Sequence, residues 1–302
     1  MPAVAHEAPP APRVERRITV GPLILSLPAV LTMLVLFVTP LTVFAVYSFL
    51  HGAFFQVSGP LTLENYREAL SSHLTRVLAK NSLVVGLLSA TVTLLVALPI
   101  AYWLRYAAGR WRTLVLFLIT ATLFASYLVR IYAWRSILGQ SGLINSGLLR
   151  LGVVDHPLGF LLYNKFSVTV ALVHIFLPYV VLVLYAGFAP LAPALLESAQ
   201  DLGANAFVRW RRVVLPLVAA PAVSSFLFVF VLSAGDYVTP QLIGGTNGVL
   251  LGVDVQSEFK AVGDFPLGAA TSLLMLGAFV VLYLVTALGL RLTRLDRIRW
   301  SN

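Results

Sequence analysis

The sequence predicts an all-α, polytopic membrane protein with six transmembrane helices. Its 302 residues are 59% hydrophobic and only 11% charged, and its mean hydropathy is +0.90. Several apolar stretches exceed the roughly 20 residues that span a bilayer core. Helices are expected because lipid offers no water to satisfy backbone N–H and C=O groups, and because these stretches lack the alternation of barrel strands.

Six apolar stretches define the expected membrane domain, residues 21–290. The spans are expected at Pro22–Leu50, Ser82–Leu104, Thr113–Leu138, Phe166–Phe188, Val213–Val238 and Pro266–Leu290. The first span is too long for a signal-peptide core, so we expect it to be retained as an anchor. A tail rich in proline and alanine, residues 1–20, precedes it and is expected to be disordered. A basic tail, residues 291–302, follows the last span.

Arginine and lysine are distributed unevenly between the two sides of the membrane. With both termini in the cytoplasm, 13 of the 21 basic and five of the 12 acidic residues lie inside, which leaves +8 there and +1 outside. Because basic residues favour the cytoplasmic side, this asymmetry predicts that both termini are cytoplasmic. It also explains the isoelectric point of 10.1 by contact with anionic headgroups and argues against nucleic acid as a partner.

Three connections are expected on the outer side. The first contains Leu61–Leu70, whose apolar positions recur near helical spacing and predict a short helix in the membrane interface. Turn-forming glycines and asparagine predict a structured connection over Gly139–Lys165. The third connection, Thr239–Phe265, contains a glycine-rich loop at Gly244–Gly248, and its stretch Asp254–Ala261 is compatible with a short helix.

The longest inside connection, residues 189–215, carries the most informative pattern. Proline ends the fourth span and suits the first turn of a new helix, so Pro193–Leu202 is expected to form a short amphipathic helix. Gly203 then provides a left-handed stop. A second helical stretch is expected from Asn205 toward Pro216, with Phe207 and Trp210 on its apolar face. Two short helices joined by a glycine bend form a knob that fits a groove on a partner protein.

The residues of this connection follow the pattern E-S-A-x₃-G-x₉-V-x-L-P. The pattern resembles the E-A-A-x₃-G-x₉-I-x-L-P loop of permease subunits of type I ABC importers, with Ser198 and Val213 as conservative departures. The resemblance implies the type I permease fold and a cytoplasmic loop that docks on an ATPase. It assigns the ATPase-coupling role to Glu197, Ser198, Ala199, Asp201, Gly203, Arg209 and Pro216. In it, Glu197 makes a charged contact, Ala199 allows close approach and Gly203 forms the bend.

The chain contains no G-x-x-x-x-G-K-[ST] phosphate loop, so energy must come from another chain or from an ion gradient. The resemblance implies that ATP and Mg²⁺ bind a partner ATPase, that this chain holds no cofactor or metal, and that it is not itself an enzyme. The implied partners are two ATPase subunits, an extracytoplasmic solute-binding protein and a second permease chain, identical or, as we expect, different but similar. The implied location is the bacterial inner membrane, and the implied mechanism is alternating access.

Further stretches resemble one branch of these importers, the spermidine/putrescine-type permeases. They are Leu61–Tyr66, Val129–Gly139, Gly142–Asn145 and Ser233–Gly245. The resemblance implies a polyamine-like or related small organic solute. The nearly neutral outer face provides no strong electrostatic funnel for a cation, so the substrate class rests on the resemblance.

Five residues are candidates for the solute path: Arg130, Trp134, Asp236, Tyr237 and Glu258. Arg130, in the third span, is either a functional cation or a snorkelling arginine in an aromatic belt. Asp236, near the outer end of the fifth span, either attracts a cationic solute or pairs with Arg130. Glu258, together with Asp254 on the same outer connection, either lines an outer vestibule, is solvated or touches a binding protein. The lone span histidine, His174, is expected to serve packing.

Two other classes of protein compete with the importer subunit. An ion-coupled secondary carrier would show paired inverted halves and acidic residues deep within its spans, and neither is evident. A membrane-embedded enzyme needs convergent nucleophilic, acid–base or metal-binding residues. Five scattered histidines and the absence of cysteine argue against such a site.

Overall fold

The computed structural model describes residues 21–53 and 55–292. The chain forms two compact units that divide between Phe44 and Ala45, so the expected membrane domain, 21–290, extends over both. The first unit contains most of α1 (Gly21–Tyr47), an apolar helix. The expected N-terminal tail lies outside the described residues. Of the expected C-terminal tail, the first two residues end α12, and the rest lies outside the described residues.

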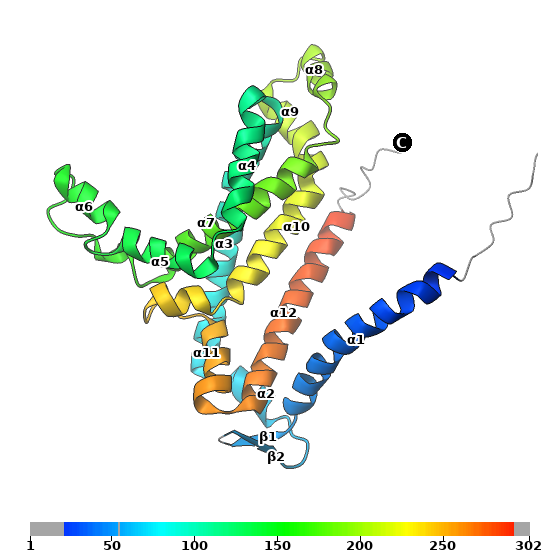
Figure 1. Ribbon diagram of the computed structural model, residues 1–302, viewed down its shortest axis with the longest axis vertical. Helices are drawn as coiled ribbons and strands as arrows, with labels where there is room; N and C mark the ends of the chain where they lie inside the picture. The colour runs from blue at the N-terminus through cyan, green and yellow to red at the C-terminus, as the bar shows by residue number, and fades with distance from the viewer. Residues whose placement is uncertain (1–20, 54, 293–302) are drawn as a thin grey trace, which may run out of the picture. The chain divides into compact units, whose positions relative to one another are not determined.

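The second unit begins with a small β-hairpin and a short helix. Strands β1 (His51–Ala53) and β2 (Gln56–Ser58) pair in antiparallel fashion. They were not expected, because three-residue strands leave no readable alternation. Helix α2 (Glu64–Ser71) begins inside the stretch Leu61–Leu70 that predicted an interfacial helix and ends one residue beyond it. The hairpin and α2 lie at the opposite end of the helical bundle from α8 (Figure 1).

Four long helical segments of the second unit are apolar enough to cross a membrane. They match the expected second, fourth, fifth and sixth spans. Their bounds are α3 (His73–Tyr106), α7 (Lys165–Gly187), α10 (Leu215–Ala234) with the turns that precede it, and α12 (Phe265–Leu292).

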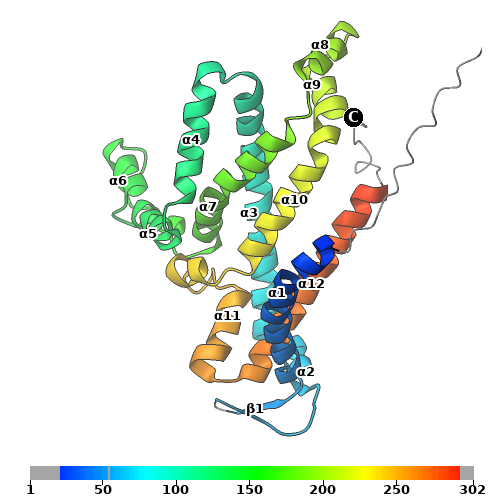
Figure 2. The same ribbon diagram turned by 45° about the vertical axis from the view of Figure 1, so that its right-hand side comes forward.

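Helices α3, α7 and α10 form the packed centre of this unit (Figure 2). Their shared core is built from small and branched side chains, among them the fully buried Val85, Ala90 and Leu172. Gly86 lets α3 and α10 approach closely. A Cβ atom at Gly86 would lie 2.9 Å from the Ala234 Cβ atom. Small residues at such crossings are the usual way in which membrane helices gain packing energy.

The third expected span is not one helix. Helices α4 (Arg112–Leu123) and α5 (Tyr127–Leu138) belong to segments that meet at 98°, and both views show α5 leaving the axis of α4 (Figures 1 and 2). The expectation of a continuous helix over Thr113–Leu138 is therefore wrong. Ser126 adopts an extended conformation between the two helices, and Arg130 donates a hydrogen bond to the freed Ala125 carbonyl at 3.1 Å. The described residues thus contain five continuous candidate spans, or six if the bent pair counts as one.

The connections between these helices are structured. Between α3 and α4 lies a 3₁₀ turn, η1, and helix α6 with a further 3₁₀ turn, η2, follows α5. Helix α11 begins three residues before the stretch that was compatible with a helix, and π-helical turns flank it. The bounds are η1 (Gly109–Trp111), α6 (Leu143–Arg150), η2 (Gly159–Leu161), η4 (Pro240–Gly244), α11 (Leu251–Ser257) and η5 (Glu258–Val262).

Candidate functional site

The segment 189–215 contains a short helix closed by a glycine turn. Helix α8 (Pro193–Asp201) has proline in its first turn. Gly203 adopts φ +82°, and its N–H bonds to the Gln200 carbonyl at 2.8 Å while the Ala204 N–H reaches the Ala199 carbonyl at 3.0 Å. These two bonds form a Schellman motif, which satisfies carbonyls that the helix end leaves free. The expected helix and its left-handed stop are both present.

One side of helix α8 faces the helical bundle, and the other side faces away from it. Leu195 and Leu196 pack partly against the hydrophobic core of the bundle. The side chains of Glu197, Ser198 and Asp201 are exposed, and the Ser198 hydroxyl bonds back to its own helix. The two acidic side chains therefore face away from the bundle and are free to meet a partner.

The second half of the segment differs from the expected short helix. Asn205 caps α9 (Ala206–Arg209) by accepting a hydrogen bond from the Val208 N–H at 2.9 Å. A π-helical turn, η3 (Trp210–Val214), then joins α9 to α10. The expected second helix is thus the first turns of a continuous membrane helix, Ala206–Ala234, and Pro216 lies half-buried in the first turn of α10.

Two large apolar side chains of this segment point away from the bundle, and they were not among the site residues expected from the sequence. Leu202 is 89% exposed and Phe207 is 72% exposed. Phe207 was expected to share an apolar face with Trp210, but Trp210 packs inward on the Tyr102 ring, with 5.0 Å between ring centroids. Exposed apolar residues beside the α8 carboxylates form a surface suited to a protein partner. The direction in which the Leu202 and Phe207 side chains point depends on the backbone turn at Gly203, and the spacing of apolar residues in the sequence does not predict that direction.

The structure separates two of the expected solute-path residues. Asp236 accepts hydrogen bonds from the Tyr127 hydroxyl at 2.9 Å and from the backbone N–H groups of Val238 and Thr239. Arg130 donates to the Ile175 and Ala125 carbonyls. Within the described part of the chain these two residues form no ion pair, so the expected alternative that they bridge each other is wrong. Each is held by its own neighbours.

Trp134 lies in a largely apolar groove of about 550 Å³ between α3, α5 and α7. Its ring meets the His174 ring edge to face at 5.6 Å, so His174 packs as expected. Lys165 also lines the groove, and its described lining contains no acidic residue. This groove is therefore poorly suited to a cationic solute. Tyr237, beside Asp236, is 40% exposed.

Glu258 lies among other carboxylates at the end of the bundle that carries α2. Burial, followed by the charges of Asp254, Asp264 and Glu68, raises the pKa of Glu258 to about 7. Its Oε2 atom is buried and has no hydrogen-bond partner among the described residues. Asp264 is used in capping α12, since it accepts the Leu267 N–H at 3.0 Å. The sequence pointed to Glu258 and Asp254, but Glu68 joins them only through the packing of α2 on α12.

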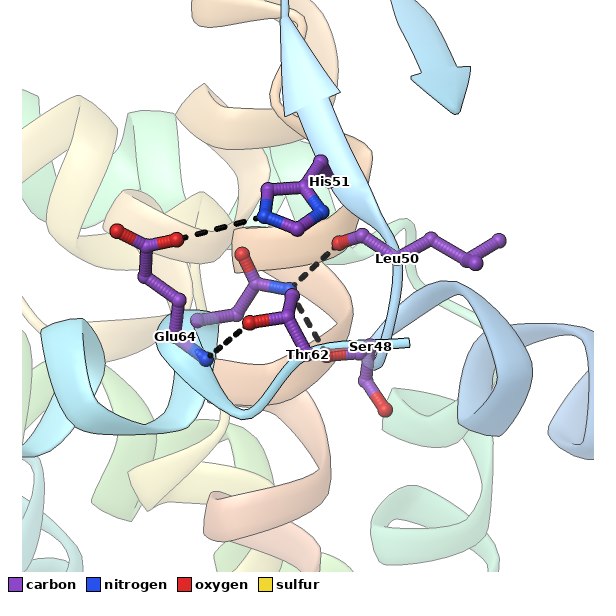
Figure 3. Close-up of polar contacts among 6 residues, drawn as sticks. Ser48, Leu50, His51, Thr62 and Glu64 are labelled. Carbon is purple, nitrogen blue, oxygen red and sulfur yellow. Dashed lines mark hydrogen bonds and ion pairs between the residues drawn. The ribbon is translucent and has the colours of Figure 1, made fainter. Parts of the chain in front are cut away.

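A second polar cluster fixes the start of α2 (Figure 3). The buried Asn65 side chain donates to the Ser48 carbonyl at 2.9 Å and to the Leu50 carbonyl at 2.8 Å. His51 and Glu64 approach to 3.5 Å, but both are largely exposed, and such surface pairs contribute little to stability. The cluster gives the Leu61–Tyr66 stretch a structural role.

The family and the sequence relatives agree on one type of protein. A family model described as "binding-protein-dependent transport system inner membrane component" matches residues 76–294. The spermidine/putrescine transport system permease protein PotB of Haemophilus influenzae is 33% identical over 214 residues, which cover 71% of this chain and 74% of PotB. PotB of Escherichia coli K12 is 32% identical over 74% of this chain and 81% of its own length. The inner membrane ABC transporter permease protein YdcU of the same organism is 30% identical over 76% and 75%, respectively.

Solved structures show a similar fold. A chain from the crystal structure of a bacterial ABC transporter involved in the import of the acidic polysaccharide alginate superposes with a TM-score of 0.72, covering 91% of this chain and 95% of its own. A second structure, of a bacterial alginate transporter in complex with its pentasaccharide-bound periplasmic protein, gives a TM-score of 0.69 over 91% and 96%. Both are 17% identical to this chain, so they support the fold alone.

Proposed function

Because the chain belongs to the family of binding-protein-dependent transport system inner membrane components and is a permease subunit of an ABC importer, we propose that it takes up a polyamine-like solute. The relatives at 32–33% identity are named for spermidine and putrescine transport. The permease is a multi-pass inner membrane protein and not an enzyme, since ATP hydrolysis belongs to a separate subunit. Two ATPases, a second permease chain and an extracytoplasmic binding protein complete the proposed importer, and any ATP and Mg²⁺ bind the ATPases.

The proposed coupling role rests on the exposed face of α8, which points away from the bundle, and on the glycine turn that ends the helix. Glu197 and Asp201 present charge there, and Leu202 and Phe207 present apolar surface. A compact knob that is formed by α8 and the first turns of the fifth span, and that carries charged and apolar side chains, fits a groove on an ATPase. ATP-driven closure of the ATPases would move α8 and turn the spans, which opens the solute path to the outside. We propose that α8 and both termini lie in the cytoplasm, which the distribution of arginine along the sequence supports.

The carboxylates around Glu258 support a cationic solute. Polyamines carry ammonium groups, which favour a carboxylate that lies near other carboxylates and lacks a partner. Asp236 already accepts three hydrogen bonds, and the groove beside Trp134 is lined by Lys165 and by no acidic residue among those described. We therefore propose that Glu258, rather than Asp236, Arg130 or Trp134, makes the first contact with the solute.

Affinity purification of the tagged chain from its native membranes in mild detergent tests the coupling role. We expect an ATPase to co-purify, to be lost on Glu197→Arg, and to be retained on Asp155→Arg, which reverses an exposed acid on the α6–η2 connection. Recovery of the chain without any ATPase, together with solute uptake that follows an ion gradient, would instead support the secondary carrier. Uptake of labelled spermidine and putrescine by the complete complex tests the substrate class.

A further inference from the structure

Both ends of the 189–215 segment are held by the last turns of α3. At the entry, the Tyr106 hydroxyl donates a hydrogen bond to the Leu191 carbonyl at 2.8 Å. At the exit, the Trp210 ring lies against the Tyr102 ring at 5.0 Å. Tyr102 and Tyr106 are one helical turn apart, and their own rings are 4.8 Å apart. One pair of tyrosines thus contacts the chain before and after α8.

A buried phenylalanine joins the two contacts. Phe188, the residue that follows α7, is fully buried. Its ring meets Tyr102 edge to face at 5.9 Å and Tyr106 at 6.2 Å. Rings at these separations attract one another and resist independent movement. The four rings therefore act as one packed unit between the ends of α3 and α7 and the turn η3.

Helix α8 has few other connections to the bundle. Its side-chain hydrogen bonds, among the described residues, remain within the segment: Ser198 bonds to Ala194, and Gln200 accepts from Arg209. Apart from the partial packing of Leu195 and Leu196, a displacement of α8 must pass into the bundle through the chain on either side. Both sides lead to the two tyrosines.

The opposite end of α3 holds the outer connection between α10 and α12. The Asn81 side chain donates to the Val249 carbonyl at 3.0 Å, and the Ser82 hydroxyl accepts the Leu251 N–H at 2.9 Å. Leu250, between these two contacts, is fully buried. A 34-residue helix is about 51 Å long. Helix α3 therefore makes specific contacts with segments at both ends of the bundle.

We propose that Tyr102 and Tyr106 are positioning residues that transmit movement of α8 through α3 to the outer connection at Val249–Leu251. Contiguous packed side chains and a continuous helix, such as the helix α3 that joins these contacts, are a physical route for such coupling. The π-helical turn at Trp210 supports the assignment, because π turns within α-helices occur frequently at functional sites. The proposal rests on the proposed docking of α8 on an ATPase.

The test uses the complete importer in proteoliposomes, with Trp210→Leu and Tyr102→Leu in the permease. We expect each variant to retain its ATPase on purification. We also expect its rate of ATP-driven uptake to fall about 5-fold or more, which is the size of effect that the loss of a coupling free energy between two sites produces. Trp210→Phe and Tyr102→Phe, which keep a ring, restore uptake. Phe226→Leu is the matched control, because Phe226 packs partly against the same core but lies outside the four-ring unit, and its uptake should not change.

A second readout reports the outer connection directly. The chain has no cysteine, so Thr246→Cys introduces a single thiol at an exposed position near Val249. In the parent we expect the maleimide labelling rate of this thiol to change when ATP is added, and in the Trp210→Leu and Tyr102→Leu variants we expect that change to be lost.

Three outcomes decide the proposal. An ATP-dependent labelling change and full uptake in both leucine variants would overturn it. If these variants fail to insert, Tyr106→Phe, which removes only the hydroxyl, replaces them, and an unaltered labelling change in that variant would also overturn it. Absence of an ATPase from the purified parent would instead contradict the proposed function, so the two failures are distinguishable.

Discussion

Arg209 donates a hydrogen bond to the Gln200 side-chain oxygen at 2.8 Å, across the turn at Gly203. The bond joins the last turn of α8 to α9, which are otherwise linked by the Schellman bonds of the backbone. The angle between α8 and the first turns of the fifth span is therefore fixed by both backbone and side chain. A knob with a fixed angle transmits a displacement, whereas a loosely hinged one absorbs it.

Gly203→Ala is expected to weaken coupling through the backbone alone. No atom lies within 4 Å of a Cβ atom at Gly203, so the new methyl group fits, but φ +82° is disfavoured for an L residue by about 1–2 kcal/mol. We expect reduced ATPase co-purification and uptake, with partial recovery in Gly203→Asn because asparagine tolerates this region. Gly277→Ala is the control, since it also has open space but no positive φ. Equal uptake in all three variants would show that the turn is not required.

Phe207→Ser is expected to reduce ATPase association without reducing the stability of the permease. Its side chain is 72% exposed, so removing it costs the fold little, whereas a partner that covers it loses about 1–2 kcal/mol of apolar contact. Co-purified ATPase, measured against permease at several salt concentrations, checks the loss. Phe160→Ser, at a similarly exposed position in η2, is the control. If both serine variants bind ATPase like the parent, Phe207 lies outside the contact.

The sequence predicted the membrane helices well because length and apolar composition determine which segments enter lipid. It predicted α8 because proline and glycine act locally at the two ends of a helix. It did not predict the break at Ser126, where neither proline nor glycine interrupts the chain and where Arg130 satisfies a freed carbonyl. It also left the role of Asp236 open, because the Tyr127 hydroxyl that binds it is 109 positions away. Contacts of this kind depend on tertiary packing, which the sequence pattern does not encode locally.

Asp236→Asn is expected to retain uptake, while Asp236→Ala loses it. All three hydrogen bonds of Asp236 come from neutral donors. An asparagine oxygen in the Oδ1 position keeps the bond from the Val238 N–H, and its amide in the Oδ2 position can donate to the Tyr127 hydroxyl, so only the bond from the Thr239 N–H is lost. Alanine instead leaves buried donors unsatisfied, at about 1–3 kcal/mol each. Thermal stability and uptake measured on both variants check this. A large loss of uptake in a stable Asp236→Asn variant would assign the negative charge to the solute path instead.

Uptake is expected to depend on pH through Glu258. Its pKa is raised to about 7 from its ordinary value of 4.5, so the folded protein binds more protons than the unfolded chain between these values. The contribution of Glu258 to the free energy of unfolding therefore falls as the pH rises from about 4.5 toward 7. Over the upper part of the same range the carboxylate becomes ionised and able to attract a cation. Uptake should therefore increase as the pH rises through about 7.

Glu258→Gln separates this effect from the pH dependence of the ATPase. The variant cannot ionise, so we expect lower uptake of spermidine at pH 8 and a loss of the increase near pH 7, together with a flatter dependence of stability on pH. Glu64→Gln is the control, because Glu64 is exposed and outside the carboxylate group around Glu258. Because the neighbouring Glu68, Asp254 and Asp264 raise the pKa of Glu258, Glu68→Gln should lower it and move the increase in uptake to lower pH. A pH profile that is the same in the parent, Glu258→Gln and Glu68→Gln would place the titrating group elsewhere in the importer.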